Sequence, residues 1–219
     1  MNLHNIYIRN KLRHAIGEKI KNHISGKVLD IGCGNKQYAN IIEAYASQHI
    51  GLDHENTLHD LNKADIVGTA YDIPADDDSF NSILCTEVLE HLEEPEKALQ
   101  ECYRVLKPGG YAVFTCPFIW HLHEEPRDFY RYTKYGLDYL FIKTGFHVVS
   151  IEPLNGFWGT FLQLLSYVMN SYNKGPLKFV PVIPAICLVV QGVGYLFDAV
   201  LPGKKWPSHY ISVIQKKNN

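Results

Sequence analysis

The chain has little of what disulfide-rich, zinc-binding or secreted proteins need. Its 219 residues include five cysteines, and no two of them form a C-x-x-C pair. This argues against a disulfide framework or a zinc knuckle and fits a reducing compartment. Residues 1–27 are polar and basic and contain no apolar run, so we expect no signal peptide and a cytoplasmic protein. The length is sufficient for one α/β domain with a large core.

The small net charge of −2 conceals an uneven distribution of charge. Residues 1–27 carry +5, residues 28–152 carry −12 and residues 153–219 carry +5. An acidic middle disfavours a broad nucleic-acid surface, so no nucleic-acid partner is predicted. Basic ends beside apolar segments are compatible with association at the inner face of an anionic membrane, and solvated helix faces explain them equally well.

Segments with strand character alternate with segments of helical periodicity along most of the chain. An N-terminal amphipathic helix is predicted in residues 1–26, where apolar side chains recur at near-helical spacing over 3–24. Further helices are predicted over 38–47, 95–106 and 135–144. Strands are predicted over 27–31, 49–53, 66–68, 80–85, 111–116, 146–152 and 210–215. This alternation indicates an α/β fold with a parallel, doubly wound sheet.

The most informative motif is a glycine-rich turn directly after the first predicted strand. Residues 28–35 read VLDIGCGN, and glycine at 32 and 34 lets the backbone turn tightly and lets a ligand approach the main chain. Asp53 follows 19 positions after Gly34, at the end of the second strand. A carboxylate there can accept two hydrogen bonds from ribose hydroxyls. A doubly wound sheet binds its ligand at this place, outside the carboxyl ends of the strands.

Three later features extend this motif into an ordered series: Asp72 after the third strand, the segment EVLEH at 87–91, and LKPGG at 106–110. The series resembles class I S-adenosylmethionine-dependent methyltransferases of the small-molecule, type 11-like kind, over roughly residues 27–154 and 209–216. The resemblance implies a Rossmann-like doubly wound sheet of seven strands, with the last strand antiparallel between strands five and six. It also implies S-adenosyl-L-methionine as cofactor and S-adenosyl-L-homocysteine as product.

The resemblance carries a set of cofactor-binding residues with it. Gly32 and Gly34 would pass beneath the methionine part of the cofactor, and Asp53 would hold the ribose. Asp72 would hold the adenine amino group, and Ile73 would pack on the ring. The full set is Asp30, Gly32, Gly34, Asp53, Asp72, Ile73, Glu87 and Val88.

Each of these assignments has a structural alternative. Asp53 could be a helix N-cap, and Asp72 could begin a turn before Pro74. A nicotinamide-dependent oxidoreductase is the nearest alternative for the whole series. Its fingerprint needs a third glycine for pyrophosphate approach, and position 37 is Gln37. The series therefore favours the sulfonium cofactor, which has no pyrophosphate.

A crowded segment at 117–132 follows the fifth strand and holds histidines, carboxylates, arginines and aromatics. An acceptor would lie at this edge of the sheet, and neutral histidine is a suitable base near pH 7. The predicted catalytic residues are His91 and His123. The predicted substrate contacts are His121, Glu124, Arg127 and Tyr130. As alternatives, the arginines could pair with Glu124 and Asp128 to hold the loop, and His91 could cap a helix. No metal site is predicted, because two histidines two apart in a loop are weak evidence.

Residues 153–206 stand outside the predicted methyltransferase domain of 27–152 and 207–217. No charged side chain occurs between 153 and 173 or between 179 and 197, and a helix so apolar is either buried on most sides or in lipid. The second run is near spanning length, but Pro181, Pro184, Gly192 and Gly194 interrupt it. We therefore expect a helical hairpin that serves as a lid, a homodimer interface or a peripheral membrane contact, and not a transmembrane span.

The sequence predicts an enzyme that moves a methyl group from S-adenosylmethionine to a small-molecule or lipid-linked acceptor by in-line displacement. For such a reaction the protein mainly aligns the reacting atoms and excludes water. The alternative is a non-catalytic S-adenosylmethionine-binding scaffold that docks through residues 153–206.

Overall fold

The computed structural model describes residues 3–175, 181–201 and 203–218 of the chain. These residues divide into two compact units. We call one the sheet unit; it comprises Ile16–Pro117, Leu122–Glu152 and Tyr210–Asn219. We call the other the hairpin unit; it comprises Met1–Ala15, Phe118–His121 and Pro153–His209.

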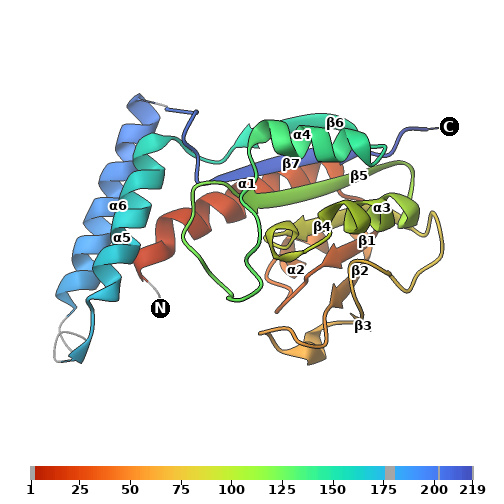
Figure 1. Ribbon diagram of the computed structural model, residues 1–219, viewed down its shortest axis with the longest axis horizontal. Coiled ribbons are helices and arrows are strands. Elements are labelled where there is room, and N and C mark those ends of the chain that lie inside the picture. Colours follow the sequence, from red (N-terminus) through yellow and green to blue (C-terminus); the bar gives the residue numbers. More distant parts are fainter. Residues whose placement is uncertain (1–2, 176–180, 202, 219) are drawn as a thin grey trace. The chain divides into compact units, whose positions relative to one another are not determined.

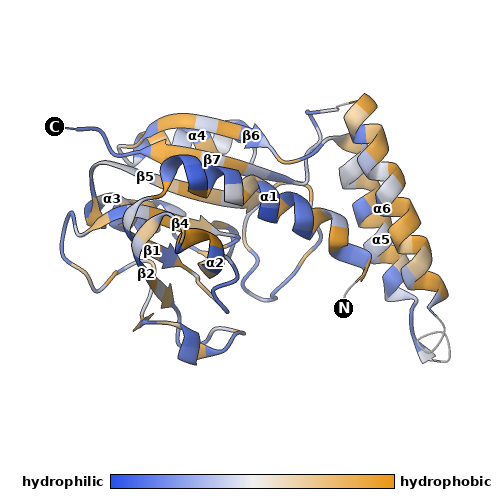
Figure 2. Ribbon diagram, turned by 180° about the vertical axis from the view of Figure 1, so that it is seen from behind, coloured by the Kyte–Doolittle hydropathy of each residue, from blue (hydrophilic) through white to orange (hydrophobic). Residues whose placement is uncertain are grey.

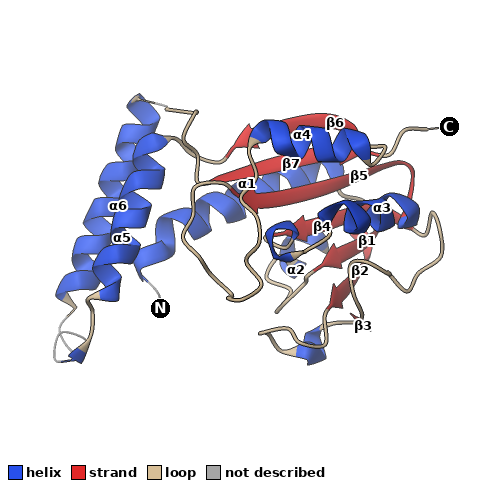
Figure 3. Ribbon diagram, viewed as in Figure 1, coloured by secondary structure: helices blue, strands red, loops and turns tan. Residues whose placement is uncertain are grey.

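A seven-stranded sheet with the order β3-β2-β1-β4-β5-β7-β6 organises the fold (Figures 1 and 3). Its strands are β1 Gly26–Ile31, β2 Ala46–Asp53, β3 Ile66–Val67, β4 Phe80–Thr86, β5 Leu106–Pro117, β6 His147–Pro153 and β7 His209–Gln215. Strands β1 to β5 pair in parallel. Lys216 bonds Gly109 and Gly110, whereas Ser208 bonds Phe118. The residues of the last strand that pair with β5 therefore run backward along the chain, from Lys216 to Ser208, as β5 runs forward from Gly109 to Phe118. Strand β7 is thus antiparallel to β5, which confirms the predicted sheet.

Helices cover both faces of the sheet. They are α1 Ile6–His23, α2 Ala39–Ile42, α3 Pro95–Val105 and α4 Lys134–Lys143. Figure 1 shows α3 and α4 on one face and α1 on the other. Each helix buries apolar side chains against the sheet, among them Ile16 and Ile20 of α1, Leu99 of α3 and Phe141 of α4, which have no exposed surface. These side chains, with the apolar strands between them, form the core that fixes the strand ends.

Two predicted elements differ from the structure. The predicted helix over 38–47 ends at Ile42, and β2 begins already at Ala46, because Gly26 of β1 pairs with Ala46 and draws the segment into the parallel ladder. Residues 107–110, which separate the predicted helix over 95–106 from the predicted strand over 111–116, are part of β5. There Gly109 donates its N–H to the carbonyl of Lys216, and Lys216 donates to Gly110. In both places, pairing with a distant strand outweighs the local signal.

The apolar insertion before the last strand forms a hairpin of two helices, α5 Phe157–Ser171 and α6 Val182–Val200. The helices approach closely at two glycines: a Cβ on Gly194 would lie 3.2 Å from the carbonyl oxygen of Trp158 and 3.5 Å from the Cα of Gly159. Small residues at a helix crossing allow this contact. The structure therefore confirms an apolar helical insertion at this place in the chain.

The hairpin has its polar side chains inside. Thr160, Gln163, Ser166 and Gln191 are at least 96% buried. The amide of Gln163 donates to the carbonyl of His4. The amide of Gln191 donates to the carbonyl of Leu3, and its oxygen accepts the N–H of Tyr7. Gln163 of α5 and Gln191 of α6 therefore bond to backbone groups of residues 3–7, among them the N–H of Tyr7 in the first turn of α1, which has no partner within its own helix.

The outer faces of both hairpin helices are apolar, as the colouring of Figure 2 shows. The exposed apolar side chains of α5 and α6 are Phe157, Phe161, Leu165, Val168, Val182, Ile186, Leu188, Val189, Val193, Tyr195, Leu196, Phe197 and Val200. By length and composition α6 could cross a membrane, and only 17% of its most apolar window is buried. One such helix is weak evidence for a span, but its low burial shows that α6 is not a core helix.

Candidate functional site

A cavity of about 850 Å³ lies in the sheet unit, where β1, β2 and β4 end. The chain runs outward from β1 through β2 to β3 and then returns to the other side of β1 as β4. The carboxyl ends of β1 and β4 therefore border a topological switch point, the usual binding place of open α/β sheets. The predicted cofactor residues that line the cavity are Asp30, Gly32, Gly34, Asp53, Glu87 and Val88.

The remaining two predicted cofactor residues are not part of the cavity lining. Asp72 is exposed, and Ile73 is buried with its N–H donated to Glu101. Thr69, Ala70 and Tyr71 line the cavity after β3 instead. Residues this close in sequence cannot be separated by spacing alone, because the turn between Thr69 and Asp72 decides which of them face the cavity.

The two glycines after β1 have backbone conformations that side chains disfavour. Gly32 has φ +65° and Gly34 has φ +49°. A Cβ on Gly32 would lie 2.3 Å from Cγ2 of Val88, and one on Gly34 would lie 2.9 Å from Cδ2 of His59. The turn therefore needs glycine both for its dihedral angles and for the close approach of Val88. Cys33 between them is buried, which raises the pKa of its thiol to about 12 and keeps it protonated.

Asp53 fixes the glycine turn from the end of β2. Its Oδ2 accepts the N–H of Gly34 at 2.9 Å, and its Oδ1 accepts the N–H of His54 at 2.8 Å. The side chain is 8% exposed and borders the cavity. Since a carboxylate has about four lone-pair sites, each oxygen keeps capacity for a ligand hydroxyl.

A partner of Asp30 was missed by the sequence analysis. Nε2 of His49, on β2, lies 3.0 Å from Oδ2 of Asp30, and both side chains are almost fully buried. Burial raises the pKa of Asp30, and the contact with His49 opposes that shift. The signal was available in the sequence, because His49 lies two residues before the position that pairs with Asp30 across the parallel ladder.

Glu90, in the turn after β4, is the second residue that sequence reasoning missed. Its carboxylate is completely buried, and within the described part of the chain neither oxygen has a hydrogen bond. Desolvation, with Glu87 nearby, raises the pKa of Glu90 well above the usual range. The motif at 87–91 was noted in the sequence, but nothing in a helical turn of three residues indicates which side chain points inward.

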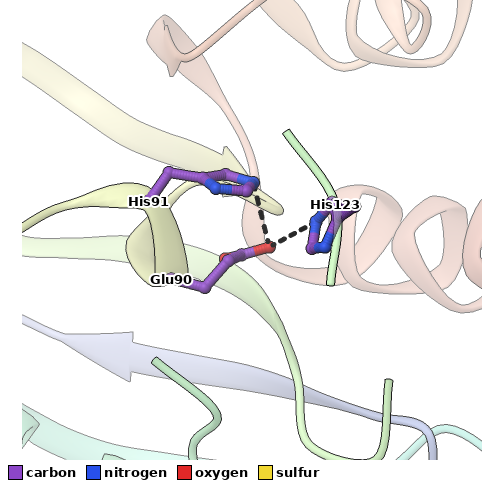
Figure 4. A group of neighbouring side chains, drawn as sticks. All are labelled: Glu90, His91 and His123. Atoms are coloured by element: carbon purple, nitrogen blue, oxygen red, sulfur yellow. Dashed lines mark ion pairs between the residues drawn. The ribbon is translucent and has the colours of Figure 1, made fainter. Parts of the chain in front are cut away.

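The two predicted catalytic histidines meet at Glu90, as Figure 4 shows. Their Nε2 atoms lie 3.7 Å (His91) and 3.9 Å (His123) from Oε1 of Glu90, and the two rings are 4.8 Å apart. His91 also borders the cavity, and its Nδ1 lies 2.5 Å from the carbonyl oxygen of Arg127. A carbonyl only accepts, so Nδ1 donates, and Nε2 is the acceptor nitrogen whenever the ring is neutral.

The loop that carries His123 is held by an ion pair. Both guanidinium nitrogens Nη1 and Nη2 of Arg131 donate to Asp128 at 2.6 Å, and Asp128 accepts the N–H of His123 at 2.9 Å. Arg131 lowers the pKa of Asp128 far below its usual range. Arg131 thus pairs with Asp128, which is the structural alternative given for this arginine in the sequence analysis. The pair positions His123.

The four predicted substrate residues separate into different surroundings. Glu124 and Arg127 line the cavity. The hydroxyl of Tyr130 donates to the carbonyl of Glu93 at 3.0 Å, outside the lining. His121 belongs to the hairpin unit, where its ring lies 4.3 Å from that of Tyr167. Geometry therefore supports Glu124 and Arg127 as residues at the cavity more than Tyr130 or His121.

Residues 29–114 match a family model described as a methyltransferase domain. The chain carries a class I methyltransferase domain. A ubiquinone biosynthesis O-methyltransferase of Alkalilimnicola ehrlichii is 28% identical over 127 residues, 52% of this chain and 48% of that protein. A probable S-adenosylmethionine-dependent methyltransferase of Mycolicibacterium smegmatis is 32% identical over 113 residues, 48% of this chain and 44% of that protein. The chain spans about half the length of the curated relatives it matches.

Among solved structures, the methyltransferase domain resembles phosphoethanolamine N-methyltransferase 2 of Haemonchus contortus, determined in complex with S-adenosyl-L-methionine. The TM-score is 0.59 at 18% identity, over 94% of this chain and 52% of that chain. At this identity the likeness shows the fold alone. The comparisons give no support to a nicotinamide-dependent enzyme or to a non-catalytic scaffold.

S-adenosylmethionine is the cofactor of this family, and the cavity of the methyltransferase domain fits it. The volume is in the range of nucleotide-sized pockets, Gly32 and Gly34 line the cavity, and the Asp53 carboxylate keeps acceptor capacity for ribose hydroxyls. When bound, the cofactor supplies a methyl group activated by its sulfonium.

Proposed function

We propose that this protein transfers a methyl group from S-adenosylmethionine to a small acceptor that is linked to a lipid. The single observation that carries the transfer is the cavity with Gly32, Gly34 and Asp53 at the switch point of a methyltransferase domain. Relatives named for ubiquinone biosynthesis, including an O- and a C-methyltransferase, favour a small-molecule acceptor.

In the proposed reaction, the acceptor atom attacks the methyl carbon in line with the carbon–sulfur bond. The new bond takes an electron pair from the acceptor, the broken bond leaves its pair on sulfur, and S-adenosylhomocysteine departs. An acceptor hydroxyl must also lose its proton. His91 borders the cavity, and the ring of His123 contacts the ring of His91. We therefore assign these two residues to the activation of the acceptor.

The lipid-linked character of the acceptor is supported by the hairpin unit. Its helices bury amides and hydroxyls and expose apolar side chains, the reverse of the arrangement expected in water. Lys204, Lys205 and the exposed Trp206 follow α6 directly. Basic side chains and tryptophan favour the interface of an anionic membrane. We therefore assign the hairpin to a membrane surface, where a lipid-linked acceptor would be found.

Transfer is tested with methyl-labelled S-adenosylmethionine and an extract of the protein's own cells, followed by partition of the products between organic and aqueous phases. Label in the organic phase is the expected result. Label in the aqueous phase would refute the lipid-linked acceptor and leave the transfer intact. Cofactor binding without transfer to any component would refute the enzymatic function. The variant Asp53→Ala should abolish the labelling.

Membrane contact is tested by flotation with liposomes that contain anionic lipid. The intact protein should float, and Val189→Glu and Leu196→Glu should remain in solution, because each places a charge on the apolar face. Ile142→Glu is the matched control, since Ile142 is equally exposed, 58% against 66% and 63%, but lies on α4 of the sheet unit. Failure of the intact protein to float, with a dimer in sedimentation, would assign the hairpin to a homodimer interface.

A further inference from the structure

Three side chains at the edge of the cavity present metal-binding atoms to one another. Glu90, His91 and His123 each offer one donor atom, and all three donors lie within 4.8 Å of one another. Two nitrogens and one carboxylate oxygen are a ligand set typical of divalent first-row transition metals. Donor atoms around one such ion lie roughly 3.4 Å apart in a tetrahedral site. Side-chain rotations that move the donor atoms by about an ångström would therefore bring these three to ligand distance.

The buried carboxylate is independent evidence for a ligand. Glu90 has no exposed surface, and neither of its oxygens has a hydrogen bond in the described structure. A buried carboxylate without hydrogen bonds costs several kcal/mol or takes up a proton instead, and a bound cation would stabilise its charged form. Its Oε1 points toward the two histidine rings (Figure 4), where a cation would satisfy it.

The surroundings of His91 resemble the outer shell of metal ligands, in which the second ring nitrogen is held by a carbonyl or a carboxylate. Nδ1 of His91 donates to the carbonyl of Arg127, and its Nε2 lies toward Glu90, where the neutral ring would offer its lone pair to a metal ion. Nδ1 of His123 lies 3.4 Å from Oδ2 of Asp128. Nη2 of Arg131, which can only donate, lies 3.5 Å from the same Nδ1, so ligation of a metal ion by Nε2 requires Nδ1 to donate to Asp128 in place of this contact.

A further carboxylate makes the site electrostatically suited to a cation. Oε2 of Glu124 lies 3.7 Å from Nε2 of His91 on the cavity side, and Glu124 is 44% exposed there. It can serve as an additional ligand or leave a position open to the cavity, as sites that bind substrate do. We propose that Glu90, His91 and His123 bind a divalent transition-metal ion of the Zn²⁺ class at the edge of the cavity.

The proposal concerns binding and is independent of methyl transfer, so the two can fail separately. If both are correct, the bound ion would supply Lewis-acid activation of the acceptor, and His91 and His123 would serve as its ligands and not as bases. The sequence did not indicate this set of ligands. The only two histidines close together in the sequence of this loop are His121 and His123, and His121 lies in the hairpin unit.

Binding is tested on full-length protein that has been treated with a chelator and then titrated with Co²⁺ and Zn²⁺. The expected result is one equivalent of Co²⁺ with a visible absorption spectrum of nitrogen and oxygen ligation, displaced by Zn²⁺. His91→Ala, His123→Ala and Glu90→Gln should each weaken binding by more than about tenfold. His147→Ala is the matched control, because His147 is exposed at the start of β6.

Circular dichroism and melting curves show whether each variant folds. If Glu90→Gln fails to fold, His91→Ala and His123→Ala still decide the question, since both side chains keep some exposed surface whereas Glu90 has none. The proposal is overturned if the intact protein binds no stoichiometric Co²⁺ or Zn²⁺, or if the two histidine variants bind as tightly as His147→Ala.

Discussion

Gly32, after β1, and Val88, after β4, lie very close together. A Cβ on Gly32 would be only 2.3 Å from Cγ2 of Val88. The glycine also has φ +65°. The two strands can border one cavity at this distance only because position 32 has no side chain. This relationship links the glycine turn to the segment after β4.

Gly32→Ala should therefore disturb the cavity on both sides. The left-handed backbone costs alanine roughly 1–2 kcal/mol, and displacement of Val88 adds to this. We expect the affinity for S-adenosylmethionine to fall by about tenfold or more, measured by isothermal titration. Gly17→Ala is the control, because its Cβ would meet Ile41 at an ordinary 3.7 Å in the interior of α1. Equal affinity in the two variants would contradict the placement of the cofactor.

Asp53→Asn tests the ribose assignment. The asparagine amide replaces one acceptor oxygen, so either the Gly34 contact or a ribose hydrogen bond is lost, and a bond to a charged group contributes about 1.5–3 kcal/mol. Cofactor affinity should fall about tenfold or more. A cofactor analogue without ribose hydroxyls should lose much less in the same comparison. If both ligands lose affinity equally, Asp53 acts only through the turn. The exposed Asp76→Asn should leave both affinities unchanged.

Asp198→Asn should destabilise the hairpin unit. The carboxylate accepts the hydroxyl of Tyr7 at 3.0 Å and the N–H groups of Gly156 and Gly159 at 2.9 and 3.0 Å. Asparagine keeps only one acceptor, so we expect a loss of about 1–3 kcal/mol in the free energy of unfolding, measured with urea. Tyr7→Phe should cost less, about 1 kcal/mol. An unchanged unfolding midpoint in Asp198→Asn would show that these contacts do not stabilise the unit.

Glu101→Gln should change how stability depends on pH. Arg104 donates two hydrogen bonds at 2.8 Å to the Glu101 carboxylate and lowers its pKa. Because the folded state therefore binds fewer protons, this contribution is complete above the unfolded pKa of about 4.3 and is lost as pH falls through the lower folded pKa. The variant should be less stable than the native protein near neutral pH, and the difference should shrink in acid. The exposed Glu43→Gln is the control; a pH-independent difference for Glu101→Gln would contradict the prediction.

The sheet and the cavity were largely predictable because their signals are local. The glycine turn needs two residues without side chains next to a buried strand, and Asp53 ends the next strand; both appear as patterns within a few residues. The strand that includes Gly109 and the early start of β2 were not predictable in the same way. Hydrogen bonds to Lys216 and Gly26 decide them, and those partners are far away in the sequence.

The sequence by itself determined the α/β sheet, the place of the glycine turn and the apolar character of residues 153–206, because backbone preference and burial patterns act over short distances. Only the tertiary structure decided that Thr160, Gln163 and Ser166 of α5 point inward, that Ala70 and Tyr71 rather than Asp72 border the cavity, and that His123 meets Glu90 and His91. The physical reason is the same in each case. The direction of a side chain in a loop or on a helix depends on which distant groups need a partner, and packing alone brings those groups together.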